Sequence, residues 1–219
     1  MTDLVSFDLH DGVATLTMDD GKANALSLAM AQAIGAGLDR AVAEAKIVVI
    51  RGRPGVLCGG FDLKVIRGGD AAQRAAMTDA GMALLARLYL HPQPLIIACT
   101  GHSVAAGGLM LLTGDIRIGV RGAFRIGLNE TAIGLSLPHL GIELARDRLA
   151  PARLTESVIR ATLYSPDDAA EAGYLDKAVD PDGFDAAIAE AIQGLRALDG
   201  VAYAATKQRL RQPTLDRLR

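Results

Sequence analysis

Two glycine-rich turns, each following an apolar stretch and leading into a helical pattern, constrain the fold of this chain most strongly. The first is CGGFDLK at 58–64, and the second is GHSVAAGGLML at 101–111, directly after LIIACT. Small residues let the backbone approach a ligand closely, and free N–H groups at a helix start point outward. Two such turns facing each other can hold one developing oxyanion between two N–H donors. Taken singly, each turn is better explained by tight packing.

Neither turn has the pattern of a nucleotide-binding loop. A P-loop needs Gly-Lys-Ser or Gly-Lys-Thr, a dinucleotide site needs G-x-G-x-x-G, and 58–64 and 101–111 match neither pattern. The chain carries 23 Lys and Arg against 25 Asp and Glu, which gives a net charge of −2. That balance gives no indication of nucleic-acid binding.

Hydrophobic periodicity predicts an α/β chain with crossover connections. A hairpin is expected to turn at Asp11-Gly12, and Ser27 is expected to cap a helix with a 3.6-residue apolar period. Further strands are expected at 46–52 and in LIIACT, and a second helix at about 71–90. The stretch RPGVLCGGFDLK is expected to be a loop that leads into a polar helix, and 182–219 is expected to be mostly helical.

Length and composition favour one well-buried domain, because the chain has 219 residues and 50% hydrophobic content. The last forty or so residues are also consistent with an appendage or an oligomer contact. Two cysteines are too few for a disulfide framework, so reduced thiols and a cytoplasmic location are expected. The first residues, MTDLVSFDLHDG, lack the apolar run of a signal peptide, and no apolar stretch is long enough to span a membrane.

Several segments, in consistent order, resemble one protein family. VLCGGFDLK, GHSVAAGGLMLLTGDIRI and FRIGLNETAIGLSLP are similar to the three signature segments of the enoyl-CoA hydratase/isomerase family, also called crotonases. GKANALS resembles the first CoA-side loop of that family, and SPDDAAEAGYLDKAV resembles its A-x-x-x-G-L-V-D segment. The resemblance extends from about Val5 to Lys207.

The resemblance implies a fold and an assembly. The implied fold is α/β, a crotonase-like superhelix of ββα units with C-terminal helices. Residues 1–180 would form the core with the acyl-CoA site, and 181–219 would form a helical region used for oligomerisation, as a trimer or a hexamer. The implied partner is an acyl-CoA substrate. No cofactor is required beyond that coenzyme A thioester, and no metal, nucleic acid or membrane is expected.

The resemblance also implies how the two turns act. Their backbone N–H groups, by motif position those of Phe61 and Ala106, would hold the thioester oxygen of an acyl-CoA. That oxygen gains charge when a proton leaves carbon 2 or a nucleophile adds at carbon 3, so fixed donors favour the transition state. One such donor is typically worth about 3–4 kcal/mol. The residues expected to contact the substrate or its CoA portion are Lys22, Ala23, Asn24, Ala25, Leu26, Cys58, Gly59, Gly60, Asp62, Leu63, Gly107, Leu109 and Leu135.

Two positions depart from the usual pattern of the family. The second turn often has GGG and here has AAGG, which puts a methyl group beside the substrate. Phe61 is bulkier than the usual Ala or Leu at the first turn. Its side chain is therefore expected to shape the acyl pocket.

Glu130, within GLNETAIGL, is the candidate acid/base, and an apolar site would raise its pKa toward neutrality. Hydratases of the family generally use two glutamates, and the position of the first is Leu109 here. Hydration divides its work between two carboxylates, whereas one base can carry a proton from carbon 2 to carbon 4. GLNET and Leu109 also resemble the Δ3,Δ2-enoyl-CoA isomerase subgroup. Isomerisation is favoured, while hydration and acyl-CoA binding without turnover remain alternatives.

Other polar residues are expected to have lesser roles. His102 is more consistent with a satisfied loop histidine than with a substrate contact, and His139 either lines the acyl pocket or only begins a helix. Glu143 is expected to face solvent or an arginine and is the reserve carboxylate. Asp62 is expected to cap a helix, and Asp115 is expected to be structural.

Basic residues suggest two further contacts. Lys22 and Lys64 are candidates for the CoA phosphates, although surface lysines are usually only solvated. The arginines in KQRLRQPTLDRLR are expected on an exposed face or at an oligomer contact.

Overall fold

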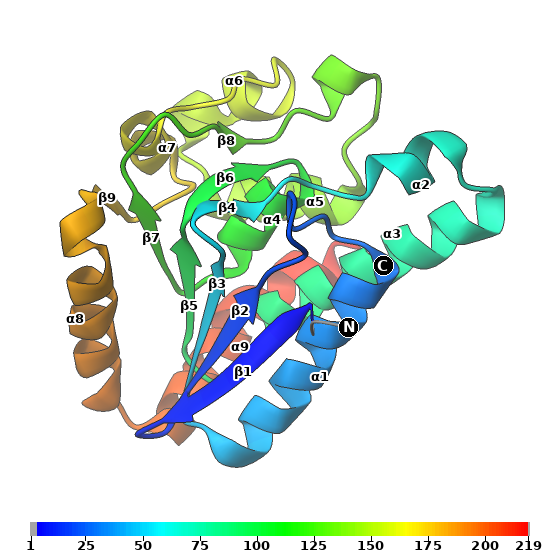
Figure 1. Cartoon of the computed structure of the whole chain (residues 1–219). Coiled ribbons are helices and arrows are strands. Elements are labelled where there is room, and N and C mark those ends of the chain that lie inside the picture. Colours follow the sequence, from blue (N-terminus) through cyan, green and yellow to red (C-terminus); the bar gives the residue numbers. More distant parts are fainter. Residues whose placement is uncertain (1–3, 219) are drawn as a thin grey trace.

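The computed structural model describes residues 4–218, which form two β-sheets and the helices that cover them (Figure 1). The elements follow one another as β1 (Val5–His10), β2 (Val13–Met18), α1 (Leu28–Glu44), β3 (Ile47–Gly52), β4 (Gly55–Cys58), α2 (Leu63–Gly68), α3 (Ala71–Tyr89), β5 (Leu95–Cys99), β6 (Gly101–Val104), α4 (Ala106–Thr113), β7 (Ile116–Val120), β8 (Ile126–Gly127), α5 (His139–Arg148), α6 (Leu154–Val158), α7 (Pro166–Ala172), β9 (Lys177–Val179), α8 (Phe184–Arg196) and α9 (Gly200–Asp216). Short 3₁₀ turns η1 (Thr131–Ile133), η2 (Pro151–Arg153) and η3 (Pro181–Gly183) lie between them.

The larger sheet has six strands in the order β1-β2-β3-β5-β7-β9. Strands β1 and β2 are antiparallel around the expected Asp11-Gly12 turn, and the later pairs are parallel. The predicted helix cap is also present, because the Ser27 hydroxyl accepts a hydrogen bond from Met30 N at 3.1 Å. The hairpin and the first two predicted helices are therefore confirmed.

A second, smaller sheet has the parallel order β4-β6-β8 and lies beyond one end of the larger sheet (Figure 1). The expectation of a loop at 53–64 and of a turn at the start of 101–111 is wrong, because β4 and β6 lie there. These two strands have only four residues each and both contain a glycine, so no periodic pattern marks them. Close approach requires the glycines: a Cβ built on Gly101 would lie 2.1 Å from the Gly55 carbonyl carbon.

Each unit of the chain crosses from the larger sheet to the smaller one. Strand β3 continues into β4, β5 into β6, and β7 into β8, and helices follow the first two pairs directly. This repetition is the ββα superhelix that the family resemblance implies, and the fold class is confirmed.

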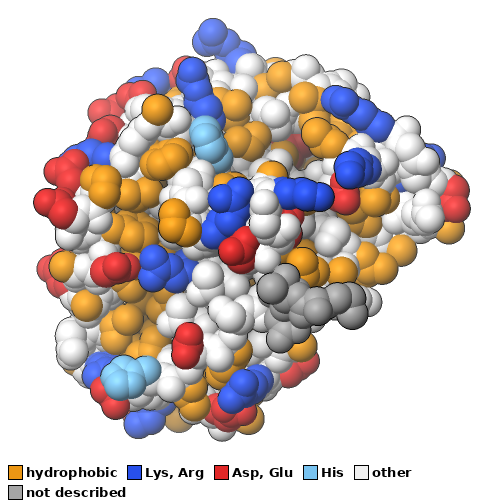
Figure 2. Space-filling view, in the orientation of Figure 1, with side chains coloured by type: hydrophobic (Ala, Val, Ile, Leu, Met, Phe, Trp, Pro, Cys, Tyr) orange, Lys and Arg blue, Asp and Glu red, His pale blue; other side chains and the backbone are white. Residues whose placement is uncertain are grey.

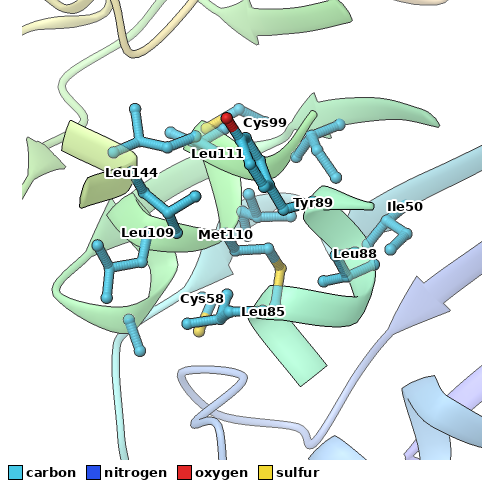
Figure 3. Packing of buried hydrophobic residues seen from close by; sticks show 14 of the residues in the cluster. Ile50, Cys58, Leu85, Leu88, Tyr89, Cys99, Leu109, Met110, Leu111 and Leu144 are labelled. Carbon is cyan, nitrogen blue, oxygen red and sulfur yellow. The ribbon is translucent and has the colours of Figure 1, made fainter. Parts of the chain in front are cut away.

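The main core lies between the larger sheet and the helices α1, α3, α4 and α5. Helix α4 is buried over its whole length, and its Leu109, Met110 and Leu111 pack among side chains of neighbouring elements such as Leu85 and Leu144 (Figure 3). Burying large aliphatic side chains contributes about 1.5–3 kcal/mol each. The start of α4, which carries the second glycine turn, is thereby held in a rigid environment.

The C-terminal helices pack against this framework. Helix α8 covers the opposite face of the larger sheet from α1 and α3 (Figure 1), and a second apolar cluster including Ile118, Phe184 and Ile188 fills the space between them. The division of the chain into a core with the acyl-CoA site at 1–180 and an oligomerisation region at 181–219 stays a prediction. None of the helices within residues 4–218 is both long and apolar enough to cross a membrane.

Helix α9 turns charged residues inward. Lys207 Nζ lies 2.7 Å from one oxygen of Asp115, and Arg211 Nη2 lies 2.9 Å from the other. Arg211 also donates to the carbonyls of Tyr89 and Thr113, at the C-terminal ends of α3 and α4, where cations are favourable. The expected structural role of Asp115 is confirmed. The expectation of exposed arginines is wrong for Arg211, which is only 4% exposed.

Candidate active site

The candidate site lies at the carboxyl ends of the three strands of the smaller sheet. Because β4, β6 and β8 are parallel, the segments that follow them emerge at the same edge. Phe61 comes three residues after β4, Ala106 two residues after β6, and Glu130 three residues after β8. The small sheet therefore gathers the two glycine turns and the candidate carboxylate, which are far apart in sequence.

The two glycine turns touch each other. A Cβ built on Gly60 would lie 3.0 Å from the Ala105 Cβ and 3.8 Å from Ala106 N. A Cβ on Gly107 would lie 2.2 Å from the Cys58 carbonyl oxygen, so a side chain at Gly107 would clash with backbone. The turns therefore pack tightly against each other. This packing brings the backbone around Phe61 close to the start of α4.

The N–H groups of Phe61 and Ala106 are the two donors expected from the family motifs. Ala106 is the first residue of α4, where N–H groups have no partner within the helix. Neither N–H donates a hydrogen bond to another group within residues 4–218. Ala105, which precedes the helix, has a φ of +53°, and its own N–H donates to Gly127 O of β8 at 2.9 Å. The second turn is thus fastened to the strand that leads to Glu130.

The loop at 20–26 braces the first turn. Gly59 N donates to Ala23 O, and Leu26 N donates to Gly60 O, both at 2.8 Å. Asn24 is fully buried, and its side-chain amide donates to Met18 O at 2.9 Å. The structure therefore brings the predicted segments 22–26 and 58–63 side by side.

The side chain of Glu130 is buried. It is 9% exposed, and its Oε2 atom has no hydrogen-bond partner within the described residues 4–218. Burial raises its pKa above the usual value, although the backbone N–H groups of Glu130 and Asn129 act in the opposite direction. Its backbone carbonyl accepts from Ile133 N at 3.1 Å and Leu135 N at 2.9 Å, which forms the turn η1. The side chain makes no cap to this turn.

Comparison with known proteins identifies the group to which this arrangement belongs. The sequence model described as enoyl-CoA hydratase/isomerase matches residues 8–219.

The chain belongs to the enoyl-CoA hydratase/isomerase family. An enoyl-CoA hydratase/isomerase family protein from Pseudomonas syringae is 44% identical, with 98% of this chain and 93% of that chain aligned and a TM-score of 0.95. A probable enoyl-CoA hydratase from Mycobacterium tuberculosis H37Rv is 36% identical over 98% and 91% of the two chains, with a TM-score of 0.93. Human mitochondrial Δ3-Δ2-enoyl-CoA isomerase is 27% identical over 98% and 86%, with a TM-score of 0.94. Both hydratase and isomerase names thus occur among its relatives.

Leu109 and Glu143 are two further positions that bear on whether the site holds a second carboxylate. Leu109, which the motif resemblance predicts at the position of the first hydratase glutamate, is 1% exposed and lies against α5, because a Cβ on Gly141 would be 3.2 Å from its Cδ2. Glu143, the reserve carboxylate, is buried beside Arg146, at 3.0 Å, and Arg217. Hydrogen bonding to Arg217 lowers the pKa of Glu143. Of the two expected environments of Glu143, the structure shows the arginine contact.

The remaining predicted residues lie as follows. Asp62 caps α2 by accepting from Lys64 N at 2.9 Å, as predicted. Leu63 and Leu135 are exposed apolar side chains on the segments that follow the first turn and Glu130. Cys58 is fully buried, and burial raises the pKa of its thiol to about 11, so it stays protonated at neutral pH.

The two histidines are both exposed. His102 lies on β6, where its Nδ1 accepts from Arg125 N at 3.0 Å, as a satisfied histidine would. His139 begins α5.

Asp20 was missed by the sequence analysis. Its carboxylate organises the 20–26 loop, and the signal for it was the Asp-Asp-Gly turn sequence that follows β2.

Two cavities lie elsewhere in the molecule. A cavity of about 690 Å³ and another of about 460 Å³ are both lined by the start of α9, and neither is lined by Glu130 or by the glycine turns. Chemistry rather than volume therefore identifies the candidate site. No group of three or more His, Cys, Asp or Glu residues placed to hold a metal ion occurs in the part of the chain that is described, residues 4–218.

Proposed function

We propose that this protein moves the double bond of a 3-enoyl-CoA to the 2-trans position, with Glu130 as the acid/base. The observation that carries the proposal is the pairing of one buried carboxylate with an apolar Leu109 at the other hydratase position. A second carboxylate of the region, Glu143, is already neutralised by Arg146 and Arg217. One base can carry a proton from carbon 2 to carbon 4, whereas hydration divides its work between two carboxylates.

The chemistry follows from this assignment. The ionised Glu130 removes a proton from carbon 2, and the electron pair moves into the thioester to form a dienolate. The N–H groups of Phe61 and Ala106 donate to the oxygen, whose charge grows in the transition state. Protonated Glu130 then returns the proton to carbon 4, and the double bond forms between carbons 2 and 3. Because burial raises the pKa of Glu130, its protonated state is accessible during the cycle.

The remaining parts of the proposal concern binding. The exposed Lys22 lies on the loop that binds the first turn, Lys64 lies at the end of that turn, and both would meet the CoA phosphates. Figure 2 shows Lys and Arg side chains across the middle of one face of the molecule. The CoA thioester is itself the substrate, and no further cofactor takes part.

The exposed apolar side chains Val201 and Leu210 on α9, at 81% and 72%, support a homo-oligomer of trimer or hexamer type, which sedimentation velocity would test. A cytoplasmic location stays a prediction, which cell fractionation would test.

The test uses 3-hexenoyl-CoA and crotonyl-CoA as substrates for the purified protein and for Glu130→Gln. We expect the conjugated-thioester absorbance to rise with 3-hexenoyl-CoA for the wild type and to stay constant for Glu130→Gln. Loss of absorbance with crotonyl-CoA would indicate hydration instead. Binding of both thioesters without any absorbance change would indicate a binding protein and would contradict the proposal.

A further inference from the structure

Asp20 holds three backbone N–H groups of one loop. Its Oδ1 accepts from Lys22 N at 2.7 Å and from Asn24 N at 2.8 Å, and its Oδ2 accepts from Ala25 N at 3.1 Å. In return, Asp20 N donates to the side-chain oxygen of Asn24 at 2.9 Å. Hydrogen bonds to an ionised acceptor are roughly twice as strong as neutral ones, so this carboxylate is the main fastening of the loop.

The ionised form of Asp20 is the one that this arrangement favours. Burial alone would raise its pKa, but the N–H groups of Asn24, Lys22 and Ala25, helped by the charge of Arg53, bring the pKa below the usual value. Arg53 also donates to the Lys22 carbonyl, so the loop is held from two sides. The loop conformation is strained at Asn24, because its φ of +49° lies in the left-handed region, which costs conformational free energy for a residue other than glycine.

The loop fastened by Asp20 grips the first glycine turn through backbone atoms. Ala23 O accepts from Gly59 N and Leu26 N donates to Gly60 O, each at 2.8 Å, immediately before Phe61. Ala23 and Leu26 each directly follow a residue whose N–H group Asp20 binds, since Ala23 follows Lys22 and Leu26 follows Ala25. A path of two hydrogen bonds, joined by the backbone between Ala25 N and Leu26 N, therefore runs from the Asp20 carboxylate to the peptide group that carries the Phe61 N–H.

We propose that Asp20 is a positioning residue for the oxyanion site, which it serves by fixing the direction of the Phe61 N–H through the 22–26 loop. The inference rests on the proposed function, since it needs the Phe61 N–H to donate to a thioester oxygen. The role assigned to Asp20 is indirect, because its carboxylate binds the loop and the loop binds the first turn. Small misplacements of a donor reduce catalysis strongly, by up to about 100-fold for 1 Å.

The test compares Asp20→Ala with Asp19→Ala, its neighbour on the same loop. Asp19 is exposed, accepts only from Gly21 N at 2.8 Å within this loop and lies 3.8 Å from Arg53. The probe is 4-(dimethylamino)cinnamoyl-CoA, whose absorption band moves to longer wavelength when its thioester oxygen accepts hydrogen bonds. The band is recorded with saturating protein, and kcat and KM are measured with 3-hexenoyl-CoA.

For Asp20→Ala we expect at least half of the red shift to be lost at saturating protein and kcat to fall about 10- to 100-fold. Asp19→Ala and Glu130→Gln should keep the wild-type shift, although Glu130→Gln has no turnover. Asp20→Asn retains one carbonyl acceptor and should give an intermediate shift, and it carries the test if Asp20→Ala does not fold by circular dichroism.

Three outcomes are decisive. A wild-type red shift in both Asp20 variants would overturn the role of Asp20 and leave the oxyanion site intact. No red shift with the wild-type protein would overturn the oxyanion site itself, and the role of Asp20 with it. An equal loss of shift in Asp19→Ala would mean that the loop as a whole, and not the Asp20 carboxylate, fixes the turn.

Discussion

The ring of Phe61 fills the space that a side chain on Gly81 would need. A Cβ built on Gly81, in the middle of α3, would lie 2.4 Å from Phe61 Cε1 and 2.7 Å from Cζ. Gly81→Ala should therefore push the ring out of its place and lower the free energy of unfolding by about 1–3 kcal/mol. Urea unfolding at neutral pH measures this loss.

A double-mutant cycle shows whether Phe61 causes that loss. Phe61→Leu shortens the side chain, so Gly81→Ala should cost clearly less in the Phe61→Leu background than in the wild type. Gly194→Ala in α8 is the matched control, because no atom lies within 4 Å of a Cβ there. That control should stabilise the protein by up to about 1 kcal/mol. Equal costs of Gly81→Ala in both backgrounds would show that the two residues do not interact.

The raised pKa of Glu130 predicts the acidic limb of the pH–rate profile. The base must be ionised to remove a proton, so kcat/KM for 3-hexenoyl-CoA should rise with pH through a midpoint above the usual glutamate value of about 4.3. Initial rates between pH 4 and 8 measure the midpoint. Glu143→Gln should leave the midpoint unchanged, since the pKa of Glu143 is lowered by Arg217. A limb centred at or below about 4.3 would contradict a desolvated base at Glu130.

The same burial predicts that Glu130→Gln stabilises the protein. The folded state binds a proton at Glu130 more tightly than the unfolded state, so ionisation costs stability as pH rises above the unfolded pKa. Glutamine carries no charge and removes this cost. The free energy of unfolding of Glu130→Gln should exceed that of the wild type at pH 7, and the difference should shrink as the pH falls through the folded pKa of Glu130 toward about 4. A difference independent of pH would point to packing instead.

Regular elements with a clear apolar period were predictable from the sequence. Helix α1 buries Met30, Ile34, Leu38 and Ala41 on its predicted face, and α3 buries the predicted Met77, Leu84, Leu85 and Leu88. Strands β4 and β6 of the small sheet were not predictable in this way. They have four residues each, too few for a period, and exist because neighbouring strands pair with them.

The candidate site was predictable where family motifs mark it, and not where loop chemistry builds it. Phe61, Ala106 and Glu130 were singled out from motif positions, and the structure gathers the segments that carry them at one sheet edge. Their catalytic roles stay predictions. Asp20 lies outside those motifs, and its three N–H contacts arise only once the loop has folded around its carboxylate.

The buried group of Asp115, Lys207 and Arg211 should contribute far more to stability than ion pairs at the surface. Asp115→Asn would leave two buried cations without their counter-charge, and breaking a buried pair in this way typically costs about 3–5 kcal/mol. Asp185→Asn is the control, because Asp185 pairs with Arg51 at 3.3 Å with a side chain that is 82% exposed, and such pairs contribute about 0–1 kcal/mol. Urea unfolding should separate the two variants by at least about 2 kcal/mol. Equal losses would mean that the carbonyls around Arg211, rather than Asp115, hold α9 in place.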